Sequence, residues 1–194
     1  MTTSQQFKKL IYPALKMAGK FIGLNGKRML NKKNTKPFKP LAPLQANSNQ
    51  GDSIHFEKFA GKYLLIANTA SHCGYTGQYA ELQQLQDRFP EKLNVLAFPA
   101  DDFAGQEPGS DDEIANFCSI NFGVQFPIMM KSDVIGPKKN EIFSWLTDPA
   151  QNGWNAKEPT WNFCKYLVNP DGILLGFFES GVSPLDEDIT GNIK

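Results

Sequence analysis

The chain has few of the residues that build metal centres and disulfide frameworks. Its 194 residues include three cysteines and two histidines. Cys73, Cys118 and Cys164 are too few and too widely spaced for a disulfide-rich secreted scaffold, and they form no Cys-x-x-Cys pair. So small a set of sulfur and imidazole ligands argues against a zinc site. We therefore expect neither a bound metal nor a cofactor.

Acidic residues are absent from the first 51 positions, where ten of the 20 Lys and Arg residues lie. The rest of the chain holds all 20 Asp and Glu residues and is strongly acidic, although the net charge is zero. Since a nucleic-acid-binding domain needs a basic surface, the acidic body argues against nucleic acid as a partner.

The basic N-terminal region has no long hydrophobic run. Residues 5–24 have an apolar helical face opposite a row of lysines, and Pro13 would kink such a helix. Because Lys16 and Lys20 interrupt the apolar residues, the segment cannot span a bilayer. Three interpretations stay open: a solvated arm, a helix on an anionic membrane surface, and a cleavable targeting segment. A linker is expected at residues 31–41.

Beyond the arm, predicted strands and helices alternate. Residues 63–69 and 93–99 are continuously apolar, as in strands covered on both faces. Ser110 and Glu113 form a capping box that opens a helix. The other expected elements are a hairpin around Asn49–Asp52, helices at 79–89 and 139–147, a strand from residue 126 and a hairpin over 164–178.

These elements predict an α/β fold in which a central mixed sheet is flanked by helices. The expected division of the chain is a basic arm and linker at residues 1–42, followed by a single domain at residues 43–194.

The stretch NTASHCGYT, residues 68–76, places Cys73 where a buried strand gives way to a turn. A thiolate is the nucleophilic form of cysteine, and a free cysteine is mostly protonated at neutral pH. A helix N-terminus offers partial positive charge and unpaired backbone N–H groups that stabilise the anion, and Gly74 permits the turn. Cys73 is therefore a candidate nucleophile, although a buried and inert cysteine gives the same local pattern.

Four ordered blocks of the sequence resemble the glutathione peroxidase family. They read GKYLLIANTASHCGYTGQYAELQQL, FPADDFAGQEPGSDDEIANFC, FGVQFPIMMKSDV and WNFCKYLVNPDG, within a match that extends over residues 43–189. The resemblance implies a thioredoxin-like fold and the reduction of hydrogen peroxide and organic or lipid hydroperoxides, which would protect against oxidative stress.

By this resemblance, Cys73 is the peroxidatic cysteine, which attacks the O–O bond and becomes a sulfenic acid. Trp161 and Asn162 occupy the family positions that hydrogen-bond the reacting sulfur. Their indole N–H and amide NH₂ groups suit this role, because such donors stabilise a sulfur anion and a developing alkoxide.

The chain departs from the family pattern at Asp101 and Asp102, where the family has asparagine and glutamine. An ionised Asp102 cannot donate a hydrogen bond and would disfavour a thiolate at Cys73. A protonated Asp102 could donate, even as a general acid to the leaving alkoxide. In a third arrangement Asp102 turns outward and the other residues form the site. The sequence leaves these alternatives open, and we expect reduced peroxidase activity.

Cys118 matches the resolving cysteine of thioredoxin-dependent members of the family. A Cys73–Cys118 disulfide requires the helix of Cys118 to unwind or shift, because bridged Cα atoms lie within about 7 Å of each other. The alternative is that Cys118 is a buried core residue, since Ile114, Phe117 and Cys118 lie on one face of the predicted helix. The resemblance implies thioredoxin, in preference to glutathione, as the reductant, and a monomer or dimer. We expect a cytoplasmic location, with membrane association if residues 5–24 bind lipid.

Two other functions compete with the peroxidase. The first is a redox sensor or relay, in which Cys73 is oxidised and passes a disulfide to a partner protein. The second is a membrane-apposed binding protein with a decayed site, which Asp102 and the basic arm would explain. Sustained peroxide consumption distinguishes the enzyme from both alternatives.

Overall fold

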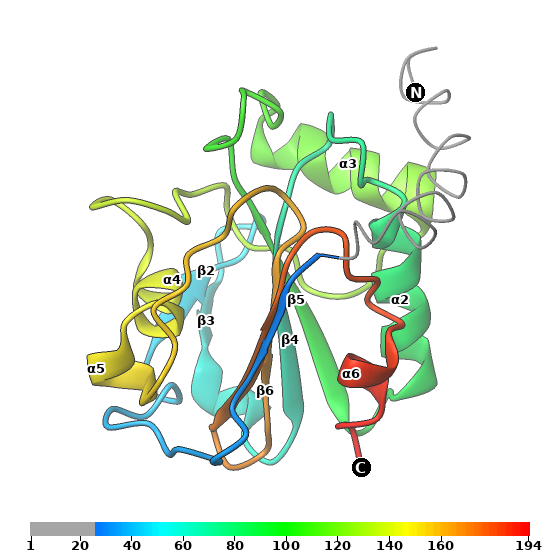
Figure 1. Cartoon of the computed structure of the whole chain (residues 1–194). Coiled ribbons are helices and arrows are strands. Elements are labelled where there is room, and N and C mark those ends of the chain that lie inside the picture. The colour runs from blue at the N-terminus through cyan, green and yellow to red at the C-terminus, as the bar shows by residue number, and fades with distance from the viewer. Residues whose placement is uncertain (1–25) are drawn as a thin grey trace.

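The structure, a computed structural model, describes residues 26–194, and Figure 1 shows a central sheet with helices on both sides. Five strands form this sheet in the order β1-β7-β6-β4-β5. β4 and β5 are parallel, whereas β6 and β7 are antiparallel to their neighbours, so the sheet is mixed as predicted. The strands are β1 (Arg28–Leu30), β4 (Tyr63–Thr69), β5 (Leu93–Pro99), β6 (Lys165–Val168) and β7 (Leu174–Phe178).

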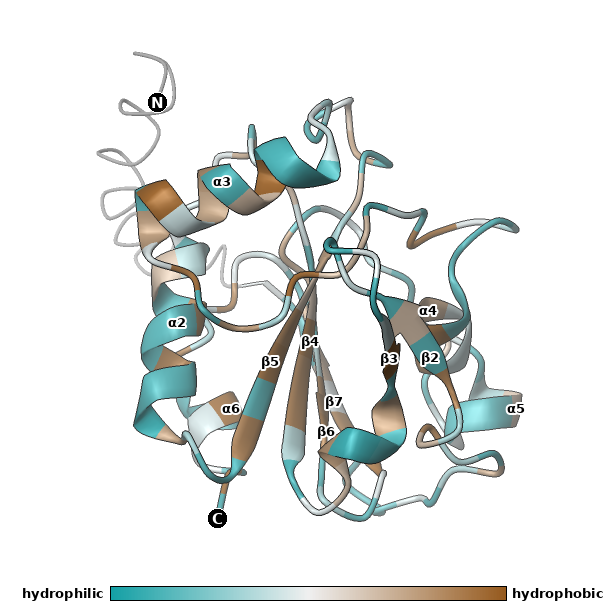
Figure 2. Ribbon diagram, turned by 180° about the vertical axis from the view of Figure 1, so that it is seen from behind, coloured by the Kyte–Doolittle hydropathy of each residue, from teal (hydrophilic) through white to brown (hydrophobic). Residues whose placement is uncertain are grey.

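The two faces of the sheet are covered by different elements (Figures 1 and 2). One face packs against α2 (Gln78–Arg88), α3 (Asp111–Phe122) and α6 (Glu187–Thr190). The other packs against α4 (Glu141–Leu146), α5 (Pro149–Asn152), a hairpin of β2 (Gln45–Asn47) and β3 (Ser53–His55), and the 3-10 helix η1 (Phe56–Phe59).

Strand β4 shows why the sheet has two cores. Successive residues of a strand point to opposite faces. Leu64 and Ile66 pack in the core with α4, whereas Leu65 and Ala67 pack in the core with α2 and α3. Burying one large apolar side chain contributes about 1.5–3 kcal/mol. The continuous apolar run therefore anchors β4 from both sides and fixes the loop that follows it.

Local signals in the sequence explain where two elements begin or turn. The predicted capping box is confirmed, because Glu113 N donates to Ser110 Oγ and Ser110 N donates to Glu113 Oε2 at 2.8 Å. In the β6–β7 turn, Gly172 N donates to Asn169 O at 2.9 Å. Gly172 has a φ of +75°, which glycine adopts without a Cβ clash.

The prediction of a strand that begins at residue 126 is wrong. Only isolated bridges form there, from Ile128 to Ala97 and from Met129 to Ser48. Pro127 has no N–H to donate to a sheet ladder, which explains why pairing does not extend into a strand.

The sequence predicts an arm and linker at residues 1–42, but part of this segment packs against the sheet. Arg28–Leu30 forms β1 and pairs with residues 176–178 of β7. Arg28 also makes ion pairs of 2.7 and 2.8 Å with Asp186 and Asp188, and Leu41 is buried in the core. Within the described residues, the packed chain therefore begins before residue 42.

The predicted amphipathic segment at residues 5–24 lies outside the described residues, so its three interpretations remain predictions. Within residues 26–194, no helix is long and apolar enough to cross a membrane. The same part of the chain contains no cluster of His, Cys, Asp and Glu side chains that could hold a metal ion.

Candidate active site

Three chain segments meet at one end of the sheet. The parallel strands β4 and β5 both end there, and β6 begins there because it runs antiparallel to β4. The loops that follow β4 and β5 and the segment that precedes β6 consequently lie together. These three segments carry four of the predicted site residues: Cys73, Asp102, Trp161 and Asn162.

Cys73 lies in the turns between β4 and α2, five residues before the helix begins. Its side chain is buried, whereas His72 is exposed and Gly74 is half-buried. The backbone N–H of Tyr75 points at Cys73 Sγ, with a distance of 3.4 Å between nitrogen and sulfur. The anion-stabilising donor expected from the helix N-terminus therefore comes from the turn before the helix.

Asn68, fully buried in β4, holds the segment that contains Trp161 and Asn162. Its Nδ2 donates to Trp161 O at 3.0 Å, its Oδ1 accepts from Cys164 N at 3.0 Å, and its backbone O accepts from Phe163 N at 2.6 Å. Phe163 has a φ of +65°, a conformation that costs a non-glycine residue about 1–3 kcal/mol. The bonds from Asn68 stabilise this strained backbone and so orient Asn162.

Gln106 connects the loop of Cys73 to Asn162. Its backbone O accepts from His72 N at 3.0 Å, and its Oε1 accepts from Asn162 Nδ2 at 3.0 Å. Asn162 is fully buried, and its Oδ1 has no hydrogen-bond partner within the described part of the chain. The amide of Asn162 is thus oriented by a side chain that the sequence analysis did not single out.

Replacing Gln106 by Met removes the acceptor for Asn162 Nδ2 but keeps the backbone bond to His72. A buried amide that loses its partner costs about 1–3 kcal/mol, so we expect the rate of Cys73 oxidation by hydrogen peroxide to fall about 10- to 100-fold. Stopped-flow fluorescence of the reduced protein measures this rate. Gln84→Met, on the exposed side of α2, is the matched control and should change nothing. Equal rates in both variants would show that the Gln106 amide does not support the reaction.

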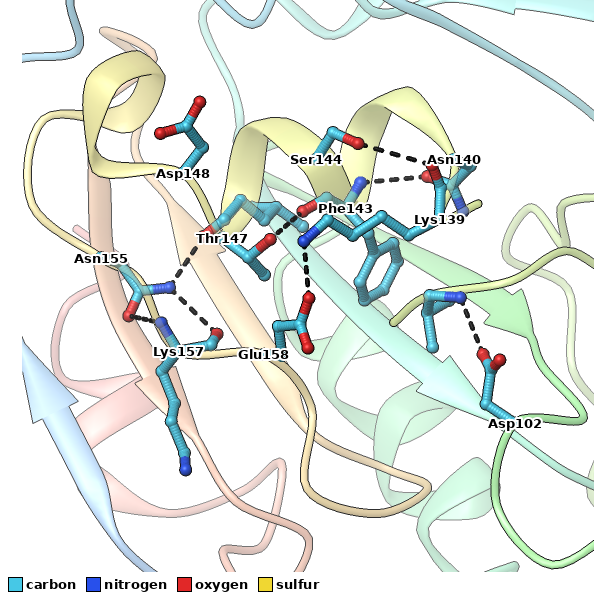
Figure 3. Close-up of polar contacts among 12 residues, drawn as sticks. Asp102, Lys139, Asn140, Phe143, Ser144, Thr147, Asp148, Asn155, Lys157 and Glu158 are labelled. Carbon is cyan, nitrogen blue, oxygen red and sulfur yellow. Dashed lines mark hydrogen bonds and ion pairs between the residues drawn. The ribbon is translucent and has the colours of Figure 1, made fainter. Parts of the chain in front are cut away.

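Asp102 bonds to backbone of a neighbouring loop. Its Oδ2 accepts from Val134 N at 2.8 Å (Figure 3), and Ile135 N–H also bonds to the carboxylate. Burial raises the pKa of Asp102, and the bond from Val134 opposes that rise. Of the three alternatives, these contacts favour the arrangement in which Asp102 turns away and the other residues form the site.

The variant Asp102→Asn keeps an oxygen for Val134 N–H and removes the charge. Because the carboxylate is bound to backbone, we expect the rate of Cys73 oxidation to change by less than about threefold between about pH 6 and pH 8. Rapid mixing with hydrogen peroxide at each pH measures the rate. An acceleration of about tenfold or more would contradict this assignment, since it would show that the charge acts on the thiolate.

Trp161 is a partly exposed apolar side chain that precedes the buried Asn162. Its side chain is 37% exposed, and its ring packs against Phe103 with 5.8 Å between ring centroids. Asn68 fixes the Trp161 backbone through the bond described above. The indole is therefore accessible to a ligand that arrives from solvent.

Cys118 is buried on the inward side of α3, one turn after Ile114. Cys73, Cys118 and Cys164 are all free thiols. Burial raises the pKa of the Cys118 thiol to about 12, and the neighbouring hydroxyl of Tyr79 opposes this rise. At neutral pH Cys118 is consequently a protonated thiol, which must lose its proton before it can act as a nucleophile.

Two buried residues follow Phe163, and one of them, Lys165, connects β6 to the start of α2. Cys164 Sγ lies 3.7 Å from the hydroxyls of Thr160 and Ser180. Lys165 Nζ donates to Gln78 Oε1 at 2.7 Å and to a nearby backbone carbonyl. Burial lowers the pKa of Lys165 to about 7, because the charged form of the amine is disfavoured away from water. Sequence reasoning did not identify Lys165.

A buried thiol in a turn at the end of a mixed sheet, with an amide oriented beside its loop, is the arrangement of a thiol-based oxidoreductase. Comparisons with known proteins agree with this class. A family model described as glutathione peroxidase matches residues 41–147, which is more than half of the chain.

The relatives are similar over most of their length. "Glutathione peroxidase-like peroxiredoxin 2" of Saccharomyces cerevisiae is 40% identical over 149 residues, which cover 75% of this chain and 92% of the relative. "Hydroperoxy fatty acid reductase gpx1" of Synechocystis is 40% identical over 156 residues, covering 77% and 90%. The chain therefore belongs to the glutathione peroxidase family, and it is a peroxidase, an oxidoreductase.

Solved structures confirm the predicted thioredoxin-like fold. T. cruzi GPX1 matches with a TM-score of 0.62 at 30% sequence identity, covering 80% of this chain and 94% of that chain. A thioredoxin family protein from Chlorobium tepidum, a thiol:disulfide interchange protein, matches with a TM-score of 0.56 over 82% of this chain and 98% of its own. At 13% identity the second match supports the fold alone.

Proposed function

We propose that this protein is a thiol peroxidase in which Cys73 reduces hydroperoxides and Cys118 resolves the oxidised product. The observation that carries the proposal is the pair of bonds made by Gln106, which ties the loop of Cys73 to the amide of Asn162. A nucleophile and a donor for the leaving oxygen are thus held together at one end of the sheet.

In the first step the Cys73 thiolate attacks the terminal oxygen of the hydroperoxide. An S–O bond forms and the O–O bond breaks, so the sulfur loses two electrons and the peroxide gains them. The departing oxygen takes a proton and leaves as an alcohol, or as water from hydrogen peroxide. Tyr75 N–H stabilises the thiolate before attack, and the N–H donors of Trp161 and Asn162 stabilise the charge that develops on the leaving oxygen.

The substrates include organic hydroperoxides. The Synechocystis relative is named for a hydroperoxy fatty acid. In this chain the exposed face of Trp161, packed on Phe103, offers an apolar surface for the organic part of such a peroxide. The buried sulfur of Cys73 would then receive only the small O–O group.

In the second half of the cycle Cys118 forms a disulfide with Cys73, and thioredoxin reduces it. The yeast relative is named a peroxiredoxin. The body of the chain is acidic, which disfavours the carboxylates of glutathione. The proposed protein is a cytoplasmic monomer or dimer, and residues 5–24 bind anionic membranes.

Turnover assays test this function. The reduced protein is supplied with hydrogen peroxide or a fatty acid hydroperoxide, and with either thioredoxin and its reductase or glutathione. We expect sustained consumption of both peroxides and faster turnover with thioredoxin. Oxidation that stops after one equivalent with both reductants would contradict the enzyme and favour a sensor.

A further inference from the structure

Glu107 is a fully buried carboxyl between the loop of Cys73 and the helix of Cys118. Its Oε2 accepts a hydrogen bond of 3.1 Å from Ser71 Oγ, two residues before Cys73. A pocket of about 370 Å³ lies against Ser71, Glu107 and Phe117, the residue that precedes Cys118. The carboxyl therefore lies beside both segments that carry the two cysteines.

Three buried polar atoms in this region have no hydrogen-bond partner among the described residues. They are Glu107 Oε1, Tyr79 Oη and Thr69 Oγ1. Burial is the main cause of the raised pKa values of Tyr79 and Cys118, and the negative charge of Glu107 adds to both. The Glu107 carboxyl is thus close to the phenol and to the thiol. Native proteins leave few buried polar groups unsatisfied, so such a cluster calls for a functional explanation.

Charged groups around Glu107 leave it able to exchange a proton near neutral pH. Glu107 N donates to Asp101 Oδ1 at 2.7 Å, and Lys131 Nζ donates to Glu107 O at 3.2 Å. His72 and Glu113 border the same pocket. Burial raises the pKa of Glu107 to about 7, a serine hydroxyl and Lys131 oppose the rise, and Asp101 adds to it.

We propose that Glu107 accepts the proton of Cys118 when that thiol attacks the sulfenic acid of Cys73, a role that rests on the proposed function. The S–H bond of Cys118 breaks, the S–S bond forms, and the S–O bond of Cys73 breaks, with the departing hydroxide leaving as water once it takes a proton. The Cys118 sulfur is oxidised and the Cys73 sulfur is reduced. Transfer from thiol to carboxylate leaves one negative charge in the buried cluster, which avoids burying a second anion.

Tyr79 gives this proton a path. Its hydroxyl lies next to Cys118 and near Thr69, and its ring packs on Phe117 of the same helix with 6.3 Å between centroids. A hydroxyl both donates and accepts, so it can take the thiol proton and pass another to Glu107.

The variant Glu107→Gln keeps the shape of the side chain and removes the base. We expect Cys73 to be oxidised at the wild-type rate, while formation of the Cys73–Cys118 disulfide slows about 10- to 100-fold. In the wild-type protein disulfide formation should accelerate from about pH 6 to about pH 8 as Glu107 ionises, and the variant should lack this rise. Rapid mixing, acid quench and mass spectrometry of the alkylated protein follow both steps.

Glu113→Gln is the matched control, because Glu113 borders the same pocket but is exposed, and glutamine also serves in a capping box. It should leave both rates and the pH profile unchanged. Melting curves should verify that Glu107→Gln is folded. The raised pKa of Glu107 means that ionisation weakens the folded state as pH rises through about 7, so the variant should melt at a higher temperature than wild type above that pH.

Each outcome decides between the two hypotheses. A disulfide that forms as fast or faster in Glu107→Gln, or that keeps the wild-type pH profile, overturns the role of Glu107 and leaves the peroxidase intact. If the wild-type protein forms no Cys73–Cys118 disulfide, the resolving step of the proposed function is overturned, and the role of Glu107 with it.

Discussion

Replacing Cys73 by Ser should abolish peroxide reduction, with kcat/KM for hydrogen peroxide falling by at least about 1000-fold. A serine hydroxyl is not ionised near neutral pH and cannot act as the sulfur nucleophile does. The turn should persist, because Tyr75 N–H can bond to the serine oxygen as it does to Sγ. Steady-state peroxide consumption with thioredoxin measures the loss, and circular dichroism verifies that the variant is folded.

Cys164→Ser is the matched control for Cys73→Ser. Cys164 is also buried, and its sulfur lies 3.7 Å from the hydroxyls of Thr160 and Ser180, which can bond to a serine in its place. We expect its activity to stay within about threefold of wild type, a difference of less than about 0.7 kcal/mol. Equal losses in the two variants would mean that the thiol of Cys73 has no special role.

Replacing Cys118 by Ser should lower turnover with thioredoxin about 100-fold or more, while the first oxidation of Cys73 stays within about twofold of wild type. The reason is that the sulfenic acid at Cys73 would lack its intramolecular thiol partner and accumulate. The inward side of α3 tolerates the change, since Tyr79 offers a hydrogen-bond partner beside residue 118.

Single-turnover and steady-state measurements separate the two effects of Cys118→Ser. A sulfenic-acid trap added after one equivalent of peroxide should label the variant and hardly label the wild type. Full turnover of the variant with thioredoxin would contradict a resolving role, because it would show that the reductant attacks the sulfenic acid directly.

The fold could be predicted largely from local patterns. The apolar run that forms β4 contains alternating partners for two cores, and the Ser110–Glu113 box defines the start of α3 within the sequence itself. The prediction of a strand from residue 126 was wrong because Pro127 has no backbone N–H to donate to a neighbouring strand. The apolar pattern on which the prediction was based does not take this missing donor into account. Pairing of β1 with β7 depends on a contact across almost the whole chain, which no local pattern encodes.

The site could be predicted only in part. The residues that carry the expected chemistry could be recognised in the sequence by their side chains: the thiol of Cys73 after a strand, and the donors of Trp161 and Asn162. The residues that orient them were not, because Asn68 and Gln106 act through contacts with segments far away in sequence. The orientation of Asp102 likewise depends on a free backbone N–H at Val134, which the sequence around Asp102 does not contain.

The burial of Glu107 could not be predicted from the sequence either. In the sequence it is one of several carboxylates between β5 and α3, and only the fold reveals that it is buried beside Tyr79 and Cys118 while its neighbours face solvent or backbone. An ionisable group kept buried at a cost in stability, next to a thiol that must lose a proton, is a candidate for chemistry.

The most direct test of the account is to locate the first oxygen that the protein takes from a peroxide. The reduced Cys118→Ser variant is mixed with a stoichiometric amount of hydrogen peroxide, the sulfenic acid is trapped, and the modified peptide is identified by mass spectrometry. We expect a single modified residue, Cys73. Modification of Cys164 instead, or no modification while the peroxide remains unconsumed, would contradict it.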